Sequence, residues 1–112
     1  MYKYHIKVVR VIDGDTIVAD VDLGFDVWMK NQHIRLSDID CAEVRTKDAA
    51  EKSRGLLARQ FLHSYISKSA GTLVLLSVDK RDGFGRILGI LYTLSGICIN
   101  DLMIVRGHAK KS

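Results

Sequence analysis

The sequence predicts a mainly β protein with helices, of the α+β class, in which five strands close a small barrel. Short alternating or β-branched runs, separated by turn residues, recur along most of the chain. One long segment between the third and fourth runs has the helical period instead. The chain has 112 residues, of which 47% are hydrophobic, and this is enough for one core. We therefore expect a single domain over residues 1–112.

Three antiparallel strands are expected in the first third of the chain. Residues 4–12 are β-branched and partly alternating, and they stop at an Asp-Gly-Asp turn over 13–15. Residues 16–23 alternate apolar and polar side chains almost ideally. Residues 27–36 resume an extended pattern, which ends in a polar stretch. The first two of these strands are therefore expected to form a hairpin.

A long helix is expected after the third strand. Asp48 can cap its N-terminus, with Glu51 three residues further on, and Gly71 ends it. Apolar side chains at i, i+4 spacing give this helix one buried face. That face comprises Leu57, Ala58, Phe61, Leu62, Tyr65 and Ile66.

Two further strands and a short closing helix complete the chain. Residues 73–78 and 86–92 are apolar runs, joined by a charged, glycine-rich loop over 79–85. This loop has the composition of a functional hairpin. Residues 100–107 contain four consecutive apolar side chains and end at Gly107, which predicts a helix with a glycine cap.

The expected order of elements is βββαββα. Five strands with a helix after the third are what a closed barrel of the OB type needs, because the helix plugs the barrel end and no strand edge stays open. An open α+β sheet is the alternative. The remaining aromatic side chains, Phe25, Trp28, Phe61 and Tyr65, are assigned to core packing.

The composition excludes several classes of protein. Charged residues make up 27% of the chain, which is not typical of disorder, and no apolar run approaches the roughly 18 residues of a membrane span. We therefore expect no membrane partner. Residues 1–7 lack the apolar region of a secretory signal. We expect a cytoplasmic or a phage- or plasmid-encoded intracellular protein, or a secreted one if a leader was trimmed.

The cysteines and histidines favour neither disulfides nor zinc. Cys41 and Cys98 are far apart and form no CxxC motif, so both are expected as reduced thiols. The four histidines show no metal-ligand spacing.

Charge is distributed unevenly along the chain. The net charge is +4, but residues 1–50 hold nine acidic and seven basic residues, whereas residues 51–112 hold four acidic and ten basic residues. An acidic cluster in a basic chain suits a protein that holds a metal ion with carboxylates and attracts a phosphate backbone with lysine and arginine.

Three segments concentrate polar residues of the kinds found in active sites: Asp-Gly-Asp-Thr at 13–16, Arg-Leu-Ser-Asp-Ile-Asp-Cys-Ala-Glu at 35–43, and Asp-Gly-Phe-Gly-Arg at 82–86. Each alone is a weak signal, but their order and spacing are specific. The set resembles the staphylococcal (micrococcal, thermostable) nuclease family, whose pattern is Asp-Gly-Asp-Thr after a strand, an arginine before Asp-x-Pro-Glu, and a Tyr-Gly-Arg hairpin. The resemblance spans about residues 6–110.

The resemblance implies a calcium ion held by the carboxylates of Asp15 and Asp40 and by the backbone carbonyl of Cys41. It implies that Asp13 lies behind these ligands and orients them, and that Thr16 shapes the turn. Ca²⁺ takes six to eight oxygen ligands, so two carboxylates and a carbonyl leave such a site open for a phosphate.

The resemblance also implies the catalytic groups. Glu43 corresponds to a general base that positions or deprotonates the attacking water. Arg35 and Arg86 correspond to two arginines that grip the phosphate. The substrate-binding residues are expected to be Lys80, Arg81 and Phe84.

The implied reaction is hydrolysis of DNA and RNA phosphodiesters by in-line attack of water, with cleavage on the 5′-oxygen side and 3′-phosphate products. The expected partners are DNA and RNA, bound largely without sequence preference, and we expect a monomer. The alternative function is a non-catalytic OB-like module that binds nucleic acid or protein. Such a module would be expected to lose one or more of five cleft residues, all present here: Asp15, Arg35, Asp40, Glu43 and Arg86.

The chain departs from the family pattern at four positions. Cys41 and Ala42 replace a threonine and a proline, and the loss of proline is expected to loosen the loop that aims Glu43. Phe84 and Gly83 replace a tyrosine and a common lysine, so one hydroxyl and one cation near the substrate are missing. Tyrosines that follow this region in secreted members lie beyond Ser112, so we expect weaker base stacking.

Overall fold

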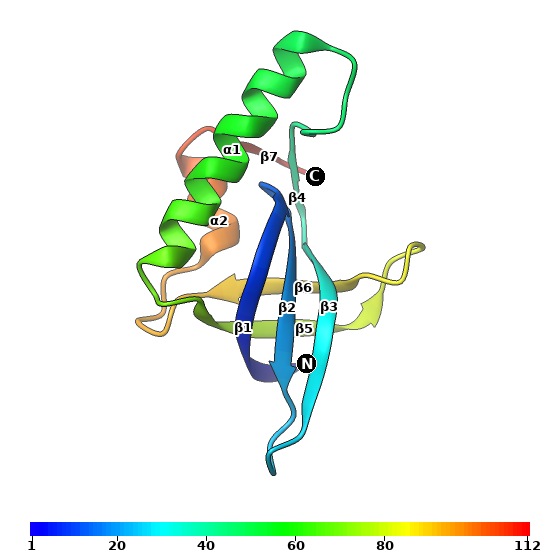
Figure 1. Cartoon of the computed structure of the whole chain (residues 1–112), viewed down its shortest axis with the longest axis vertical. Helices are drawn as coiled ribbons and strands as arrows, with labels where there is room; N and C mark the ends of the chain where they lie inside the picture. The colour runs from blue at the N-terminus through cyan, green and yellow to red at the C-terminus, as the bar shows by residue number, and fades with distance from the viewer.

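A computed structural model describes residues 1–112, apart from the side chain of residue 79. Five strands close a barrel in the order β1-β2-β3-β6-β5, and all neighbours are antiparallel except the pair β3 and β6 (Figure 1). The predicted five-stranded barrel is confirmed. Its strands are β1 (Tyr2–Asp13), β2 (Thr16–Asp22), β3 (Trp28–Leu36), β5 (Thr72–Arg81) and β6 (Ile87–Tyr92).

The other elements lie at one end of the barrel (Figure 1). They are the helices α1 (Ala49–Ser67) and α2 (Ile99–Val105) and the short strands β4 (Ile39–Cys41) and β7 (Ala109–Lys111). The predicted order did not include β4 and β7, which pair antiparallel with each other in a separate two-stranded sheet. A three-residue strand within a polar stretch has too little alternation to be recognised in the sequence, and its partner lies near the other end of the chain.

The turn between β1 and β2 depends on a glycine. A Cβ added to Gly14 would lie 2.8 Å from the Cβ of Ala58 in α1 and 2.9 Å from the Sγ of Cys41 in β4. No larger residue fits there without displacing one of these neighbours. Gly14 therefore lets the turn pack closely between α1 and β4, which fixes the two aspartates that flank it.

Helix α1 begins where the sequence predicts. The Asp48 side chain accepts hydrogen bonds from the backbone N–H groups of Ala50 and Glu51, at 3.0 and 3.3 Å. The helix ends at Ser67, and Gly71, with a φ of +78°, closes the turn that follows by donating to the carbonyl of Ile66. Its most buried residues are Gly55, Ala58, Leu62 and Ile66.

Five of the expected core assignments need comment. Leu57 was expected on the buried face of α1, but its side chain is 57% exposed. Phe25 and Trp28 are also exposed, because they lie at the outer end of the β2–β3 hairpin, beyond the barrel core. The core assignment was wrong for these three residues. Phe61 is partly buried against the core, as expected, and so is Tyr65.

The loop between β5 and β6 is shorter than predicted. Strand β5 continues to Arg81 and the turn lies within residues 82–86, whereas the sequence indicated a loop over 79–85. The side chain of Asp79, which that loop included, lies outside the described residues. The closing helix α2 is confirmed, and Gly107 follows it with a φ of +76°.

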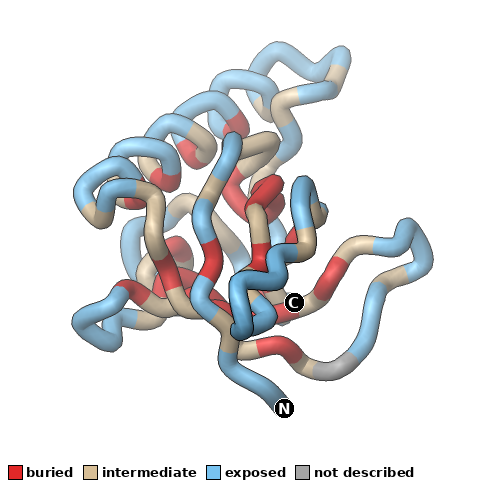
Figure 2. Tube along the Cα trace, turned by 60° about the horizontal axis from the view of Figure 1, so that its bottom comes forward, coloured by how far each residue is buried: buried red, intermediate tan, exposed pale blue. Residues whose placement is uncertain are grey.

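A single core fills the barrel and continues under both helices (Figure 2). Asn100 of α2 is buried within it, and its side chain accepts from Leu91 N and donates to the carbonyls of Ser37 and Gly89. Because a buried amide is costly unless it is hydrogen-bonded, these contacts fix α2 against β6 and the turn after β3. No helix in the described residues is long and apolar enough to span a membrane.

Candidate active site

The ends of three strands bring the predicted metal ligands together. Asp15 lies in the turn before β2, Arg35 lies at the end of β3, and Asp40 lies in β4. Strand β3 pairs with the start of β2, with Thr16 opposite Arg35, and Leu36 N donates to the carbonyl of Asp15 at 2.8 Å. Pairing of β2 with β3 therefore places Asp15 beside Arg35, although they are far apart in sequence.

Arg35 connects these segments through its guanidinium group. Its Nη1 donates to the backbone carbonyls of Leu36 and Ile39, at 2.6 and 2.8 Å. Its Nη2 lies 2.5 Å from Oδ1 of Asp40 and 3.4 Å from Oδ2 of Asp15. Since both carboxylates contact one nitrogen, they lie on the same side of the guanidinium and within a short distance of each other.

Asp15 is buried, and each oxygen of its carboxylate accepts a hydrogen bond. Oδ1 accepts the hydroxyl of Thr16 at 3.0 Å, and Oδ2 accepts the backbone N–H of Cys41 at 2.9 Å. Burial of a carboxylate is costly unless its oxygens are hydrogen-bonded, and these two donors offset that cost. Thr16 thus orients Asp15 directly, and Cys41 N ties β4 to the β1–β2 turn. The side chain of Asp40, in contrast, is 64% exposed.

The backbone carbonyl of Cys41 is the third oxygen ligand that the resemblance implies. Within a strand, the N–H and C=O of one residue point to the same edge. Because Cys41 N donates to Asp15, the Cys41 carbonyl also faces the edge of β4 on which Asp15 lies. Burial, reinforced by the charge of Asp15, raises the pKa of the Cys41 thiol to about 12, so its sulfur stays protonated and neutral.

These donors fit a hard cation. Two carboxylates and a carbonyl are oxygen ligands of the kind that Ca²⁺ prefers, and Asp40 is exposed enough for further ligands to approach. The described residues contain no cluster of three or more histidine, cysteine, aspartate or glutamate side chains that could hold a metal ion. Any cation at this position would therefore depend on a main-chain oxygen and on ligands from outside the protein.

The loop that carries Glu43 is held at two points. Oδ1 of Asp13 accepts the backbone N–H of Val44 at 3.0 Å. A Cβ added to Gly55 of α1 would lie 2.5 Å from the carbonyl oxygen of Glu43, so the loop packs directly against the helix backbone. The Glu43 side chain itself is exposed. The observed contact of Asp13 is therefore with the loop that carries Glu43, whereas the resemblance implied that Asp13 orients the metal ligands.

Arg86 is positioned by a residue to which the sequence analysis gave no role. Oδ2 of Asp82 accepts Nε of Arg86 at 2.6 Å, while Oδ1 accepts the backbone N–H groups of Phe84 and Arg86, both at 2.9 Å. Desolvation raises the pKa of Asp82, but these hydrogen bonds and the charge of Arg86 outweigh it, so the pKa is lowered. An aspartate followed by Gly-x-Gly is a turn signal, and this pattern could have identified the contact.

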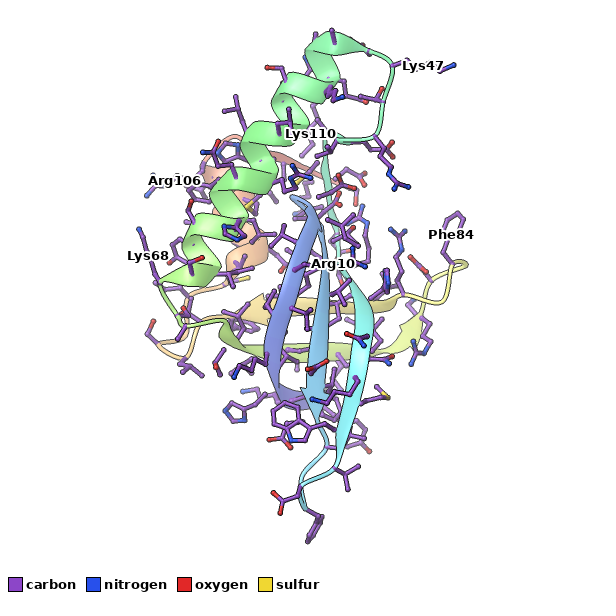
Figure 3. The ribbon with its side chains drawn as sticks, viewed as in Figure 1. Arg10, Lys47, Lys68, Phe84, Arg106 and Lys110 are labelled. Carbon is purple, nitrogen blue, oxygen red and sulfur yellow. The ribbon has the colours of Figure 1, made fainter. Side chains whose placement is uncertain are left out.

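A cleft of about 490 Å³ joins the two arginines. Its lining includes Arg35, Arg86, Asp82 and Lys80, from β3, β5 and the β5–β6 hairpin. Phe84 projects from the tip of that hairpin and is 86% exposed, with the Cζ of Arg86 5.4 Å from its ring centre (Figure 3).

Arg81 does not line the cleft that contains Arg35 and Arg86. Its Nη1 donates to the carbonyl of Gly85 at 2.8 Å and its Nη2 to Oε1 of Gln32 at 3.3 Å. It lines a different cleft, of about 430 Å³, beside Tyr2 and Met29. Of the three predicted substrate-binding residues, only Lys80 lines both clefts.

Comparison with known proteins agrees with this geometry. A family described as "Staphylococcal nuclease homologue" matches residues 33–112. An "Uncharacterized endonuclease" of Escherichia coli is 35% identical over 106 residues, which cover 94% of this chain and 59% of that protein. The "Thermonuclease" of Staphylococcus hyicus is 30% identical over 106 residues, covering 93% of this chain and 57% of that protein.

A larger protein also contains a similar segment. "Endonuclease YhcR" of Bacillus subtilis is 29% identical over 113 residues, which cover 96% of this chain and 9% of that protein. The chain spans less than two thirds of the length of each of these relatives. The family match covers most of the chain, and the barrel and the relatives agree with it. This chain belongs to the staphylococcal nuclease family.

Proposed function

We propose that this chain is a calcium-dependent nuclease that hydrolyses phosphodiester bonds of DNA and RNA by in-line attack of water and leaves 3′-phosphate ends. The observation that supports this most directly is the position of Arg35. Its guanidinium contacts both carboxylates of the donor set and also lines the cleft that contains Arg86. This position of Arg35 would let cation ligands and phosphate-binding groups act on the same phosphate.

Three groups would hold the cation: the carboxylates of Asp15 and Asp40 and the carbonyl of Cys41. A bound Ca²⁺ would supply positive charge next to a phosphate oxygen. Thr16 and the Cys41 N–H each donate a hydrogen bond to Asp15 and fix the orientation of its carboxylate. Asp40 is exposed and can adjust, so the protein provides one rigid ligand and one adaptable ligand.

The two arginines would bind the phosphate from one side of the cleft. In the Arg86 guanidinium, Asp82 contacts Nε, and within the described residues no hydrogen bond or ion pair involves the two terminal nitrogens. Those nitrogens can donate to two oxygens of one phosphate, a geometry that lysine lacks. Arg35 is held by two carbonyls at Nη1, so its orientation is fixed before the substrate arrives.

Glu43 would act on the attacking water. Its carboxylate is exposed, as a general base that contacts solvent must be, and it is not part of the donor set. Its backbone is held by Asp13 through Val44 and by close packing against Gly55. This arrangement gives the loop a defined position beside the donor set while leaving the side chain available.

Nuclease assays with defined metals test the proposal. Plasmid DNA and a structured RNA are incubated with the chain in Ca²⁺, Mg²⁺ or excess EDTA. We expect cleavage of both in Ca²⁺ and none in EDTA, and we expect products that polymerases extend only after phosphatase treatment. Full activity in EDTA would refute the metal assignment, and products extended without phosphatase would refute the 3′-phosphate assignment.

The same assay separates this proposal from a binding module. A non-catalytic module would bind labelled oligonucleotides but cleave neither substrate in any metal. We expect binding without sequence preference, since lysine and arginine contacts to phosphates carry no base information. We also expect a monomer, which sedimentation of the purified chain would measure.

A further inference from the structure

A second basic groove lies between β1 and α1, outside the cleft that contains Arg35 and Arg86. It has a volume of about 650 Å³ and shares no lining residue with that cleft. We call it the β1–α1 groove. It is lined by Val9, Arg10, Val11, Leu56, Arg59, Gln60 and His63.

One wall of the β1–α1 groove is a face of helix α1, and the other is the irregular part of strand β1. Its helical residues recur at positions 56, 59, 60 and 63, which is the spacing of one helix face. On the other wall, the pairing of β1 with β2 shifts register between Val8 and Arg10. Such a bulge redirects the side chains around it. Val9, at the bulge, is 51% exposed.

The charges in the β1–α1 groove are all of one kind. Arg10 and Arg59 are cationic, His63 shares the lining with them, and no carboxylate belongs to it. Across the described residues, no ion pair or hydrogen bond involves the side chains of these three residues. Arg35 and Arg86, in contrast, are both paired with aspartates. Unpaired cations gathered in a concave surface attract polyanions.

The rest of the lining suits a nucleic-acid strand. Exposed apolar surface from Val9 and Leu56 lies between the cationic groups. Proteins that bind single strands without sequence preference use a positive groove that follows the phosphates. The lining has no Phe, Tyr or Trp on which bases could stack, so the contacts expected here are with the phosphate backbone. Figure 3 labels Arg10 on β1, and Figure 1 shows α1 beside the upper end of that strand.

We propose that the β1–α1 groove is an auxiliary binding site for the phosphate backbone of a nucleic-acid strand. The inference rests on the proposed nuclease function and adds a place where a strand is held apart from the scissile bond. The longest dimension of the molecule is 46 Å. A strand held in both sites must be longer than one held in the active cleft alone, so we expect the groove to add to the affinity of a long strand and not to that of a trinucleotide.

Binding measurements on one double variant test this proposal. Arg10→Gln with Arg59→Gln removes two cations, and Lys7→Gln with Lys52→Gln is the control, since it removes one exposed cation from each of the same two elements outside the groove. The dissociation constants of a labelled 20-nucleotide DNA strand and of a labelled trinucleotide are measured in EDTA between 50 and 200 mM salt.

For the long strand, we expect the groove variant to reduce the slope of log affinity against log salt by about 1.4, which is about 0.7 for each lost phosphate contact. Between 50 and 200 mM salt, the fold-decrease in affinity should therefore be about seven times smaller for the variant than for the wild type. Trinucleotide binding should not change. The control should alter the slope by less than about 0.5. Circular dichroism checks the fold, and Arg10→Gln alone should give about half the effect.

Several results would overturn the proposal. If the groove variant has the wild-type slope, or if the control has an equal effect, the groove does not bind the strand. If trinucleotide binding falls equally, the two arginines act on the active cleft or on the fold. Cleavage separates this inference from the proposed function. A wild-type chain that cleaves nothing, but binds long strands through Arg10 and Arg59, would refute the nuclease proposal and leave the groove in place.

Discussion

At Glu43, we expect the effect of a substitution on cleavage to be distinct from its effect on stability. Its backbone packs against Gly55, but its side chain is exposed, and no hydrogen bond or ion pair links it to the other described residues. We therefore expect Glu43→Gln to reduce turnover by about 10²–10⁴. Its unfolding free energy should stay within about 0.5 kcal/mol of the wild type. Steady-state cleavage and urea unfolding measure the two quantities. Near-normal turnover would exclude Glu43 as the base.

Arg35 is expected to affect both stability and activity. Arg35→Lys keeps one positive charge, but a single ammonium cannot serve two carbonyls and two carboxylates at once. We expect a loss of about 1–3 kcal/mol in unfolding free energy and severely impaired cleavage. Arg45→Lys is the matched control, because Arg45 is exposed on the neighbouring loop. Normal cleavage by Arg35→Lys would mean that charge alone holds the phosphate.

Asp82 links the turn between β5 and β6 to Arg86, and the stability that this link contributes should be lost in acid. Its pKa is lowered in the folded chain, so its stabilising contribution is complete above the ordinary carboxyl value of about 4 and is lost as the pH falls through the lower folded value. Asp82→Asn keeps an oxygen for the turn but loses the charge. We expect this variant to unfold with a shallower pH dependence below about pH 4 and to bind substrate more weakly.

A control for Asp82 exists in the other hairpin. Asp22 accepts the backbone N–H of Gly24 at 2.8 Å in the β2–β3 turn, and it does not line the cleft of Arg35 and Arg86. Asp22→Asn should leave cleavage unchanged. If both variants weakened substrate binding and slowed turnover to the same degree, Asp82 would be a turn residue without a role in placing Arg86.

At the scale of elements, helix α1 and the Glu43 loop act as one unit. Replacing an exposed helical glycine by alanine stabilises a helix by about 1 kcal/mol. At Gly55, however, the added Cβ would lie 2.5 Å from a backbone oxygen of Glu43, so helix and loop must separate. We expect Gly55→Ala to lower both stability and turnover. Ser53→Ala, at an exposed position of the same helix, should change neither.

The replacement of proline by Ala42 was expected to loosen the loop that aims Glu43. The structure supplies other constraints nearby. Strand β4 pairs with β7, Cys41 N donates to Asp15, and Val44 N donates to Asp13. These contacts hold the backbone on both sides of Ala42. They come from three different elements, so their contribution depends on the tertiary fold.

At the scale of the whole molecule, charge should govern binding. Residues 51–112 hold ten basic and four acidic residues, and phosphate contacts release counterions. We expect the affinity for any DNA or RNA strand to fall steadily as salt rises, regardless of sequence. Fluorescence anisotropy with several unrelated oligonucleotides measures this. An affinity that does not depend on salt, or a strong preference for one sequence, would contradict it.

The sequence by itself determined the barrel strands, the start of α1 at Asp48, the closing helix and the family. Strand alternation, helical period and caps are local properties, so they can be read along the chain. Leu57, Phe25 and Trp28 were misassigned, because an apolar residue shows no local sign of whether another element will cover it. Strands β4 and β7 were missed because each is stabilised by a partner about 70 residues away.

The residue types of the candidate site were also determined by the sequence, but their contacts were not. The tertiary structure alone decided that one nitrogen of Arg35 contacts both Asp15 and Asp40, and that Asp13 holds Val44. It also decided that the β1–α1 groove gathers cations from two elements. These contacts join residues on different strands, loops and helices. Only closure of the barrel and packing of α1 against it bring them within reach of one another.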